Sequence, residues 1–421
     1  MNVTKKEISV LSLPVLVGAL GFFVDIYDLL VFNIVRIKSL KDLGLNEQQC
    51  STTGENILNW QMFGLAIGGI LWGILGDKKG RKSVLFGSIL LYSITTIANG
   101  FVHDVTAYTI LRFIAGLGLA GELGASITLT SEMLPKEKRG IAAAIIATSG
   151  VMGTITAYIV QSSTSHIHEG WRLCYFIGGG MGLLLLLLRV KVIDSSLYDA
   201  AKKDHLQMGN FLMFFYNKDR FIRYLKSILI GLPVWYVIGV LISFSNEFAT
   251  RFGIKDFDQP KALMLQYVGL AFGDMLAGIL SNIIKSRKKT LLIYYCLLSI
   301  FITLFFTLKG GGNAFNMYII CILLGFGSGI SVLYITMSAE NFGTNLRATA
   351  AISIPNLVRV FLIPISLLFK FLRSDVFFSP TDNTGYITAA WIVGIVVMVT
   401  GFIAAIKTKE TFGKELDFVE E

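Results

Sequence analysis

The chain has 421 residues, of which 54% are hydrophobic and only 15% are charged, with a formal net charge of +9. An ordinary soluble domain carries about 25% charged residues, so this composition excludes a typical soluble protein. The apolar residues come in blocks near the roughly 20 residues that a membrane helix needs, so the surplus of cations indicates membrane topology rather than a nucleic-acid partner.

Long apolar runs predict twelve membrane helices, and we expect an all-α polytopic membrane protein. The first run contains two aspartates and lacks a small-residue cleavage site, so we interpret it as a membrane helix rather than a signal peptide. The expected spans are 8–36, 57–76, 83–102, 105–131, 140–162, 171–192, 223–249, 261–284, 289–308, 314–338, 349–372 and 386–406.

An uneven distribution of cations predicts the orientation of these helices. About 25 of the 37 Lys and Arg residues fall on the side that carries both chain ends. Because Lys and Arg accumulate in cytoplasmic loops, we expect both termini to be cytoplasmic, in a bacterial-type inner membrane. The expected partners are the lipid bilayer, protons and a small-molecule substrate, with no nucleic acid, and we expect a monomer.

A charged segment divides the chain into two halves that look repeated. The expected units are a first six-helix bundle at 1–193, a cytoplasmic linker at 194–222, a second bundle at 223–406 and a cytoplasmic tail at 407–421. Gly64-Leu65-Ala66 in the first half recurs as Gly269-Leu270-Ala271 in the second. A tandem repeat of two halves predicts a substrate site at the midplane between them.

Two carboxylates in the first expected helix are candidate proton carriers. Asp25 and Asp28 are three residues apart and share a helix face. Two carboxylates so placed repel each other, which favours holding a proton on one of them. Tyr27 lies between them as a candidate substrate contact. The alternative is that one aspartate only caps a broken helix or pairs with a cation.

A basic turn follows the second expected helix. Gly73 precedes the turn Gly76-Asp77-Lys78-Lys79-Gly80-Arg81-Lys82, a pattern that resembles the loop signature of the major facilitator superfamily of transporters. The resemblance implies a latch in which Asp77 pairs with cations such as Arg139 and caps a facing helix. In the second half Asn282 replaces the acid, so the latch is expected to be stronger in the first half. The gating candidates are Gly73, Asp77, Gly80, Arg81, Lys82, Glu132, Arg139, Asp274, Glu340 and Arg347.

Later helices supply further charged and aromatic candidates. Arg112 and Glu122 are ten residues apart in the expected fourth helix, so they face roughly one way about 15 Å apart. Glu122 is a third candidate proton carrier. Arg359 lies deep in the eleventh helix and needs an anion, which is Asp25, Asp28 or the substrate. The candidate substrate contacts are Arg112, Arg359, Asn356, Tyr27, Trp235 and Tyr236.

Several of these segments resemble the major facilitator superfamily of transporters. Its loop signature matches at 73–82, and the segments 21–28, 112–122, 132–140 and 340–349 resemble motifs of its metabolite:proton symporter and sugar or phosphate porter branches. The resemblance implies two six-helix pseudo-repeats that rock against each other to give alternating access. It also implies a secondary active carrier that uses a proton gradient and no cofactor.

The sequence lacks the motifs of pumps, metalloproteins and enzymes. It has no P-loop, no metal-type His/Cys spacing and no nucleophile pattern, and we interpret His166 and His168 as solvated loop residues. We therefore expect a non-enzymatic carrier that imports a small carboxylate-type anion with protons. The alternatives are proton-coupled export of a metabolite, siderophore or drug, and a carrier-derived sensor that transports nothing.

Overall fold

The computed structural model describes residues 12–134, 136–188, 210–309, 312–373, 383–414 and 418–420. These residues form helices joined by short loops, without a strand among them. Nine of the described helices are long and apolar enough to cross a membrane. The expected all-α polytopic fold is thus confirmed, while most of the expected linker, 194–209, lies outside the described residues.

The first half of the chain supplies seven helices. They are α1 (Leu13–Asp42), α2 (Glu47–Lys79), α3 (Arg81–Asn99), α4 (Val105–Leu119), α5 (Glu122–Met133), α6 (Lys136–Thr164) and α7 (Gly170–Leu188).

The second half begins with the short helix α9 (Met213–Tyr216). It continues with α10 (Lys218–Tyr236), the π-helix η2 (Val237–Ile242), α11 (Ser245–Phe252), α12 (Gln259–Ile283), α13 (Arg287–Thr307), α14 (Ala314–Gly327), α15 (Ile330–Asn341), α16 (Arg347–Val360), α17 (Leu362–Leu372) and α18 (Asn383–Ile406).

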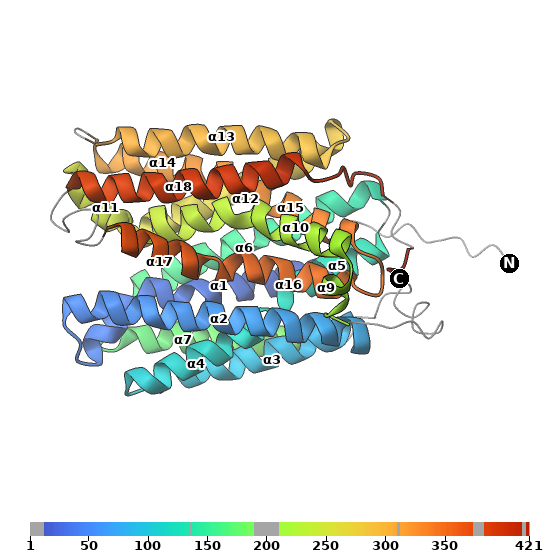
Figure 1. Cartoon of the computed structure of the whole chain (residues 1–421). Coiled ribbons are helices and arrows are strands. Elements are labelled where there is room, and N and C mark those ends of the chain that lie inside the picture. Colours follow the sequence, from blue (N-terminus) through green and yellow to red (C-terminus); the bar gives the residue numbers. More distant parts are fainter. Residues whose placement is uncertain are drawn as a thin grey trace.

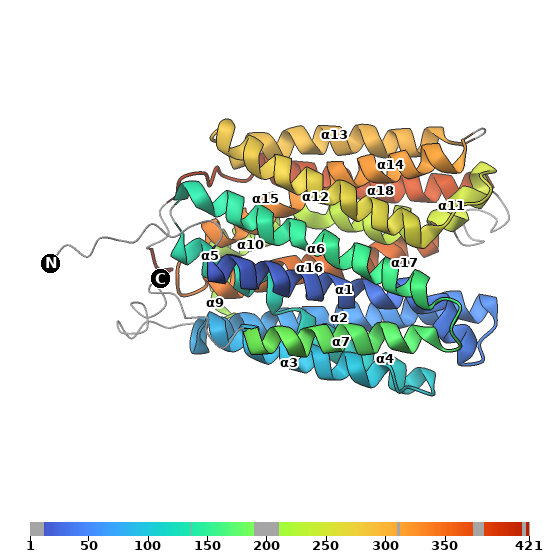
Figure 2. The ribbon, with the colours of Figure 1, turned by 180° about the vertical axis from the view of Figure 1, so that it is seen from behind.

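The two halves lie side by side with their helices roughly parallel to one long direction. Figures 1 and 2 show α13 and α14 at one edge of the bundle and α3 and α4 at the opposite edge. At the boundary, α2 packs against α16, and α6 packs against α12. Helix α1 begins and α18 ends at the same end of the bundle, which we call the terminal end, and the opposite end is the far end (Figure 1).

Four of the expected helices are interrupted. The span expected at 105–131 divides between α4 and α5, and the span expected at 314–338 divides between α14 and α15. The span expected at 349–372 divides between α16 and α17, and the span expected at 223–249 divides among α10, η2 and α11. Glycines at the breaks allow a close approach that a continuous side-chain surface would prevent. A Cβ at Gly329 would lie 2.3 Å from the carbonyl carbon of Gly273 in α12. Broken helices are tolerated at membrane depth where they are buried in protein or line a cavity.

The terminal end is closed by direct packing of the two halves. A small apolar cluster joins α1, α3 and α5 of the first half to α16 of the second. The backbones are so close that a Cβ at Gly124 would lie 2.5 Å from Ile352 Cα. The members of the cluster are Val17, Val84, Leu85, Ala125, Leu129, Ala348 and Ile352.

Candidate functional site

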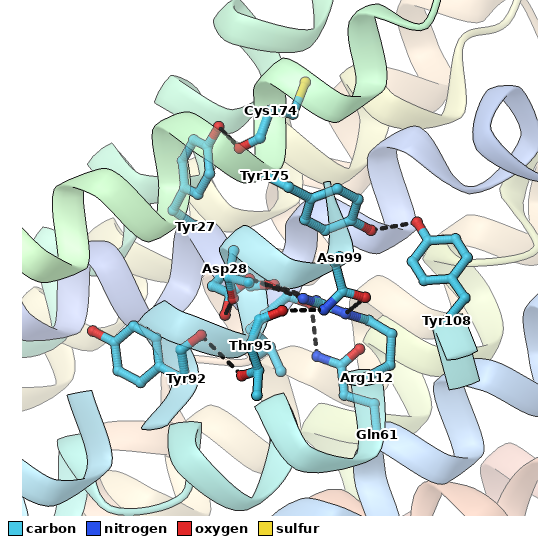
Figure 3. A network of polar contacts seen from close by, with 12 residues as sticks. Tyr27, Asp28, Gln61, Tyr92, Thr95, Asn99, Tyr108, Arg112, Cys174 and Tyr175 are labelled. Carbon is cyan, nitrogen blue, oxygen red and sulfur yellow. Dashed lines mark hydrogen bonds and ion pairs between the residues drawn. The ribbon is translucent and has the colours of Figure 1, made fainter. Parts of the chain in front are cut away.

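A buried ion pair lies inside the first half, between α1 and α4 (Figure 3). Arg112 Nη2 is 3.4 Å from Asp28 Oδ1, and both side chains are fully buried. Thr96 of α3 donates a hydrogen bond of 2.5 Å to the other carboxylate oxygen of Asp28. Both charges of a buried ion pair need partners of this kind, because removal of either one leaves an uncompensated charge in the protein interior. Arg112 therefore binds a protein carboxylate and is not among the residues of the cavity described below.

The other faces of Arg112 are also occupied by protein groups. Its Nε donates to Asn99 Oδ1 at 3.1 Å, and its guanidinium carbon lies 4.9 Å from the centre of the Tyr175 ring. The Tyr175 hydroxyl in turn lies 2.5 Å from the Tyr108 hydroxyl. Sequence analysis did not single out Thr96 or Asn99, although isolated polar residues in an otherwise apolar helix are the signal that could have found them.

The other two candidates in α1 have different surroundings. Tyr27 donates its hydroxyl to the carbonyl of Cys174 in α7 at 2.9 Å, so it packs within the first half (Figure 3). Asp25 is fully buried and lies within electrostatic range of Tyr267 in α12, which belongs to the second half. Asp28 is thus directed into the first half, while Asp25 lies close to the boundary between the halves.

Glu122 begins a new helix instead of continuing the helix of Arg112. The single helix expected for both residues is interrupted, because α4 ends at Leu119 and α5 begins at Glu122. Glu122 is fully buried, and Ser126 Oγ donates to its carboxylate at 3.1 Å. The carbonyl of Ala120, freed by the break, accepts a hydrogen bond of 2.7 Å from Asn356 of the second half.

A cavity lies between the two halves, midway along their helices. We call it the central cavity. Its empty space, counted together with the open solvent that it reaches, is about 670 Å³, of which about 60 Å³ admits the centre of a water-sized molecule. Among the described residues that line it, Arg359 is the one cation and Asp274 the one acid. The first half contributes Phe22, Ile26 and Leu29, and the aromatic residues of the second half are Trp235, Tyr267 and Tyr334.

Arg359 is presented to the central cavity without a carboxylate partner among the described residues. Its Nη1 donates to Asn356 Oδ1 at 3.2 Å, and its guanidinium carbon lies 5.7 Å from the centre of the Trp235 ring. Asn356 is fixed by its own bonds to the carbonyls of Ala120 and Ile352, at 2.7 and 2.8 Å. This arrangement orients the guanidinium and leaves donors for an anion, since arginine has five N–H groups.

Trp235 and Tyr236 are neighbours in α10 but have different roles. Trp235 lines the central cavity, whereas the Tyr236 hydroxyl donates to the carbonyl of Ala390 in α18 at 2.7 Å. Tyr236 is fully buried in the second half and is not among the cavity residues. The structure therefore brings Arg359, Asn356 and Trp235 together and places Arg112, Tyr27 and Tyr236 elsewhere.

Asp274 lies in the wall of the central cavity, away from the loops that we expected to form a latch. Both of its carboxylate oxygens accept from Ser331 Oγ, at 2.7 and 2.8 Å, and one also accepts from the backbone amide of Val332 at 3.1 Å. These contacts stabilise the start of α15, because the first amides of a helix lack partners within it. Asp274 thus lines the central cavity and also binds the start of α15, at the break in the tenth predicted helix.

Asp77 makes the capping contact that its position predicts. Its carboxylate accepts from the backbone amides of Ala348 and Thr349, at 3.2 and 2.9 Å, and from Thr349 Oγ1 at 2.6 Å. These residues are in the first turn of α16, so an acid of the first half stabilises the positive end of a second-half helix. Gly73 permits the approach, because a Cβ there would lie 2.9 Å from Thr349 Cα.

Among the remaining latch candidates, Gly80, Lys82 and Arg347 lie in the described part of the structure. Gly80 joins α2 to α3 with a φ of 93°, a conformation that favours glycine. Lys82 lies 5.6 Å from the centre of the Phe86 ring, and Arg347 is fully buried at the start of α16. The side chains of Arg81, Glu132 and Arg139 lie outside the described residues, so the expected pairing of Asp77 with Arg139 stays a prediction.

The corresponding loop of the second half is tied to its own half. Glu340 lies 3.3 Å from Arg287 Nη2 and accepts from Thr411 Oγ1 at 2.7 Å. Glu410, after α18, accepts from the backbone amides of Arg287 and Lys288, at 2.9 and 3.3 Å, at the start of α13. Burial raises the pKa of Glu410, but hydrogen bonds from Ser286 and from backbone amides outweigh burial and hold this pKa below its ordinary value.

Histidines and metal ligands do not gather in the described part of the chain. No group of three His, Cys, Asp or Glu side chains there has the arrangement of a metal site. His166 and His168 are exposed in the loop between α6 and α7. Their exposure agrees with the interpretation of both histidines as solvated loop residues.

Relatives of known function match the chain over much of its length. The gentisate transporter of Corynebacterium glutamicum is 25% identical over 80% of this chain and 75% of its own length. The benzoate transport protein of Acinetobacter baylyi is 27% identical over 47% of this chain and 42% of its own length.

A solved structure and a family model cover the chain more fully. The proton:xylose symporter XylE, bound to 6-bromo-6-deoxy-D-glucose, superimposes with a TM-score of 0.75 at 18% identity, over 96% of this chain and 97% of that chain. The family model described as Major Facilitator Superfamily matches residues 18–359. The chain is therefore a transporter rather than an enzyme, and it belongs to the major facilitator superfamily.

Proposed function

We propose that this transporter imports small aromatic carboxylates together with protons. The observation that carries the proposal is Arg359, a buried cation that faces a cavity with aromatic walls and has no carboxylate partner among the described residues. A guanidinium binds a carboxylate through two parallel hydrogen bonds, and the rings of Trp235 and Tyr267 offer flat apolar surfaces to an aromatic substrate. The substrates named for the gentisate and benzoate transporters support this choice.

The proton would be carried by buried carboxylates of α1, with Asp28 as the first candidate. Arg112 stabilises the charged form of Asp28, and Thr96 donates to it. Protonation of Asp28 would release the guanidinium from its anion and loosen the packing of α1 against α4. Asp25 and Glu122 remain further candidates. One proton and one monocarboxylate together move no net charge, so the pH gradient drives their accumulation, and each further proton would add about 2.3 kcal/mol per 100 mV of membrane potential.

The direction of transport follows from the proposed orientation. The surplus of Lys and Arg on the terminal end favours a cytoplasmic location for that end, in a bacterial-type inner membrane. The terminal end is closed by the apolar cluster and by Asp77, and this is the state in which a substrate from outside would bind. The chain is proposed to work as a monomer, without a cofactor.

Uptake by cells tests the proposal. Cells that express the chain should accumulate radiolabelled benzoate, gentisate or niacin more at pH 5.5 than at pH 7.5, and should not accumulate xylose. Arg359→Gln should lower uptake by about 100-fold, since it removes two charged hydrogen bonds, and Arg359→Lys should restore part of it. Binding of the same compounds should raise the thermal stability of the purified protein, but not that of Arg359→Gln.

Other outcomes would overturn parts of the proposal. Stabilisation only by neutral or cationic compounds would assign Arg359 to internal packing and refute the anion site. Proton-driven accumulation in inside-out vesicles, without uptake by cells, would show an exporter.

A further inference from the structure

A second cavity lies between the central cavity and the far end of the molecule. We call it the outer cavity. Its empty space, counted together with the open solvent that it reaches, is about 630 Å³, and it is lined by α1 and α2 of the first half and by α10, η2 and α17 of the second. The two cavities share Leu29, Trp235 and Ile238. In α1 the central cavity is lined by residues up to Leu29, and the outer cavity by residues from Leu29 to Arg36, so the two follow each other along the helix.

Arg36 gives the outer cavity a cation without a partner. The helix α1 runs to Asp42, so Arg36 lies well inside it, and no described residue makes a hydrogen bond or ion pair with its guanidinium. Its side chain lies across Gly54 of α2, where a Cβ would be only 2.4 Å from Arg36 Cδ. An arginine that is partly buried between two bundles, with unused donors toward a cavity, has the chemistry of an anion site.

The groups around Arg36 fit an amphiphilic anion. Asn33, Asn59 and Ser366 offer polar contacts, while Leu58, Met62 and Phe244 form apolar walls. Two acids, Glu55 of α2 and Glu247 of α11, lie within electrostatic range of Arg36.

Glu55 is itself held by another cation. Its carboxylate is 3.7 Å from Arg373 Nη2, and Arg373 in turn packs on the rings of Phe244, Phe369 and Tyr386. Glu55 therefore forms an ion pair with Arg373, whereas no described residue, Glu247 included, forms one with Arg36.

We propose that Arg36 forms an outer site at which the carboxylate of the substrate binds before it reaches Arg359. Leu29, Trp235 and Ile238 separate this outer site from the central site, so the ligand passes these three residues as it moves from one arginine to the other. The inference rests on the proposed transport of aromatic carboxylates and adds a second site of the same chemical class. An outer site acts on capture from the far end only, whereas Arg359 acts on transport from both ends.

Transport measured separately from the two faces tests this inference, with radiolabelled benzoate as the probe. In intact cells, Arg36→Gln should raise KM about tenfold, because one charged contact is lost, and leave the maximal rate unchanged. In inside-out vesicles, where benzoate enters from the terminal end, KM should stay at the wild-type value. Arg36→Lys should restore part of the capture in cells.

Two further variants separate a site from a general effect of charge or folding. Lys38→Gln removes the same charge two residues along α1, from a side chain that donates to the carbonyls of Ser165 and Ile167 instead of facing the outer cavity. It should leave KM unchanged from both faces. Gly54→Val keeps the charge but displaces the side chain of Arg36, and it should raise KM in intact cells only.

The outcomes also separate this inference from the proposed function. Normal KM in cells for Arg36→Gln, or equal increases from both faces, would overturn the outer site while the proposed function stands. A wild-type protein that transports none of the aromatic carboxylates would refute the proposed function, and the outer site with it.

Discussion

The two halves of this transporter use their charged residues in opposite ways. In the first half, the buried cation Arg112 is neutralised inside the half by Asp28, and the loop acid Asp77 reaches across to cap α16. In the second half, the buried cation Arg359 faces the central cavity, and Glu340 at the end of α15 pairs with Arg287 of the same half. A repeated sequence plan has therefore produced a half that closes the terminal end and a half that offers a cation to a ligand.

The difference follows from which partners are present. Asn282 stands where the first half has its loop acid, and among the described residues no acid at that position caps a helix of the other half. The side chain of Asn282 is neutral, and its Oδ1 accepts a hydrogen bond from Arg287 Nη1 of the same half at 3.3 Å. The start of α13 is capped instead by Glu410, which follows the last helix. Carboxylates placed at helix starts stabilise them in both halves, but only one of these contacts joins the halves.

The largest effect is expected from Asp28→Asn. This substitution removes a protonatable group and leaves Arg112 buried without its anion, a change that costs about 3–5 kcal/mol of stability in comparable pairs. We expect uphill accumulation of substrate to stop while exchange of labelled for unlabelled substrate continues. Proteoliposomes with and without an imposed pH gradient measure both activities.

The double variant Asp28→Asn with Arg112→Gln is the matched control. It should recover much of the thermal stability, because no unpaired charge remains, without recovering accumulation. Accumulation that persists in Asp28→Asn would remove Asp28 from the coupling step and would point to Asp25, Asp274 or Glu122.

An intermediate effect is expected from Asp77→Ala. Loss of a helix cap costs about 1–2 kcal/mol, and here that cost falls on the closed terminal end only. The labelling rate of Ile352→Cys, whose position lies in the apolar cluster of that end, should rise about tenfold in the Asp77→Ala background. Thr349→Val removes one of the hydrogen bonds to Asp77 and should give a smaller increase. Equal labelling rates in all backgrounds would show that apolar packing alone closes this end.

The smallest effect is expected from Glu410→Gln, because its contacts lie within one half. The folded state lowers the pKa of Glu410, so its contribution to stability is present above the pKa of the unfolded chain, about 4.3, and is lost as the pH falls through the folded value. The variant should melt at a lower temperature than wild type at pH 7, and the difference should shrink below pH 4. An effect on labelling of Ile352→Cys would contradict the separation of the two halves.

Local sequence patterns predicted the helices, and the resemblance to the loop signature of the family predicted the cap of Asp77. Apolar runs of membrane length define helices regardless of their neighbours. The acid of the 76–82 turn ends a helix at the membrane surface, where the start of another helix is a natural partner. The family resemblance added the prediction that a site lies at the boundary between the halves, where Arg359 and Trp235 line the central cavity.

The partners of buried charges could not be predicted, because they depend on how helices rotate against each other. The sequence analysis considered Arg359 as a partner of Asp28, but the packing of α1 against α4 brings Arg112 to this carboxylate instead. The break at Gly121 also depends on close contact with α3, where a Cβ would lie 2.8 Å from Ser88 Cβ. Arg36 was missed because the first expected helix ended at this residue, whereas α1 continues to Asp42.

The cap of Asp77 also has a consequence for the speed of transport. Every cycle that opens the terminal end must break the contacts of Asp77 with Ala348 and Thr349 and later form them again. A contact of about 1–2 kcal/mol is therefore part of the barrier that opening of the terminal end must cross. Each additional 1.4 kcal/mol in this contact would slow opening about tenfold, so the contact of a single carboxylate can limit the rate of the transport cycle.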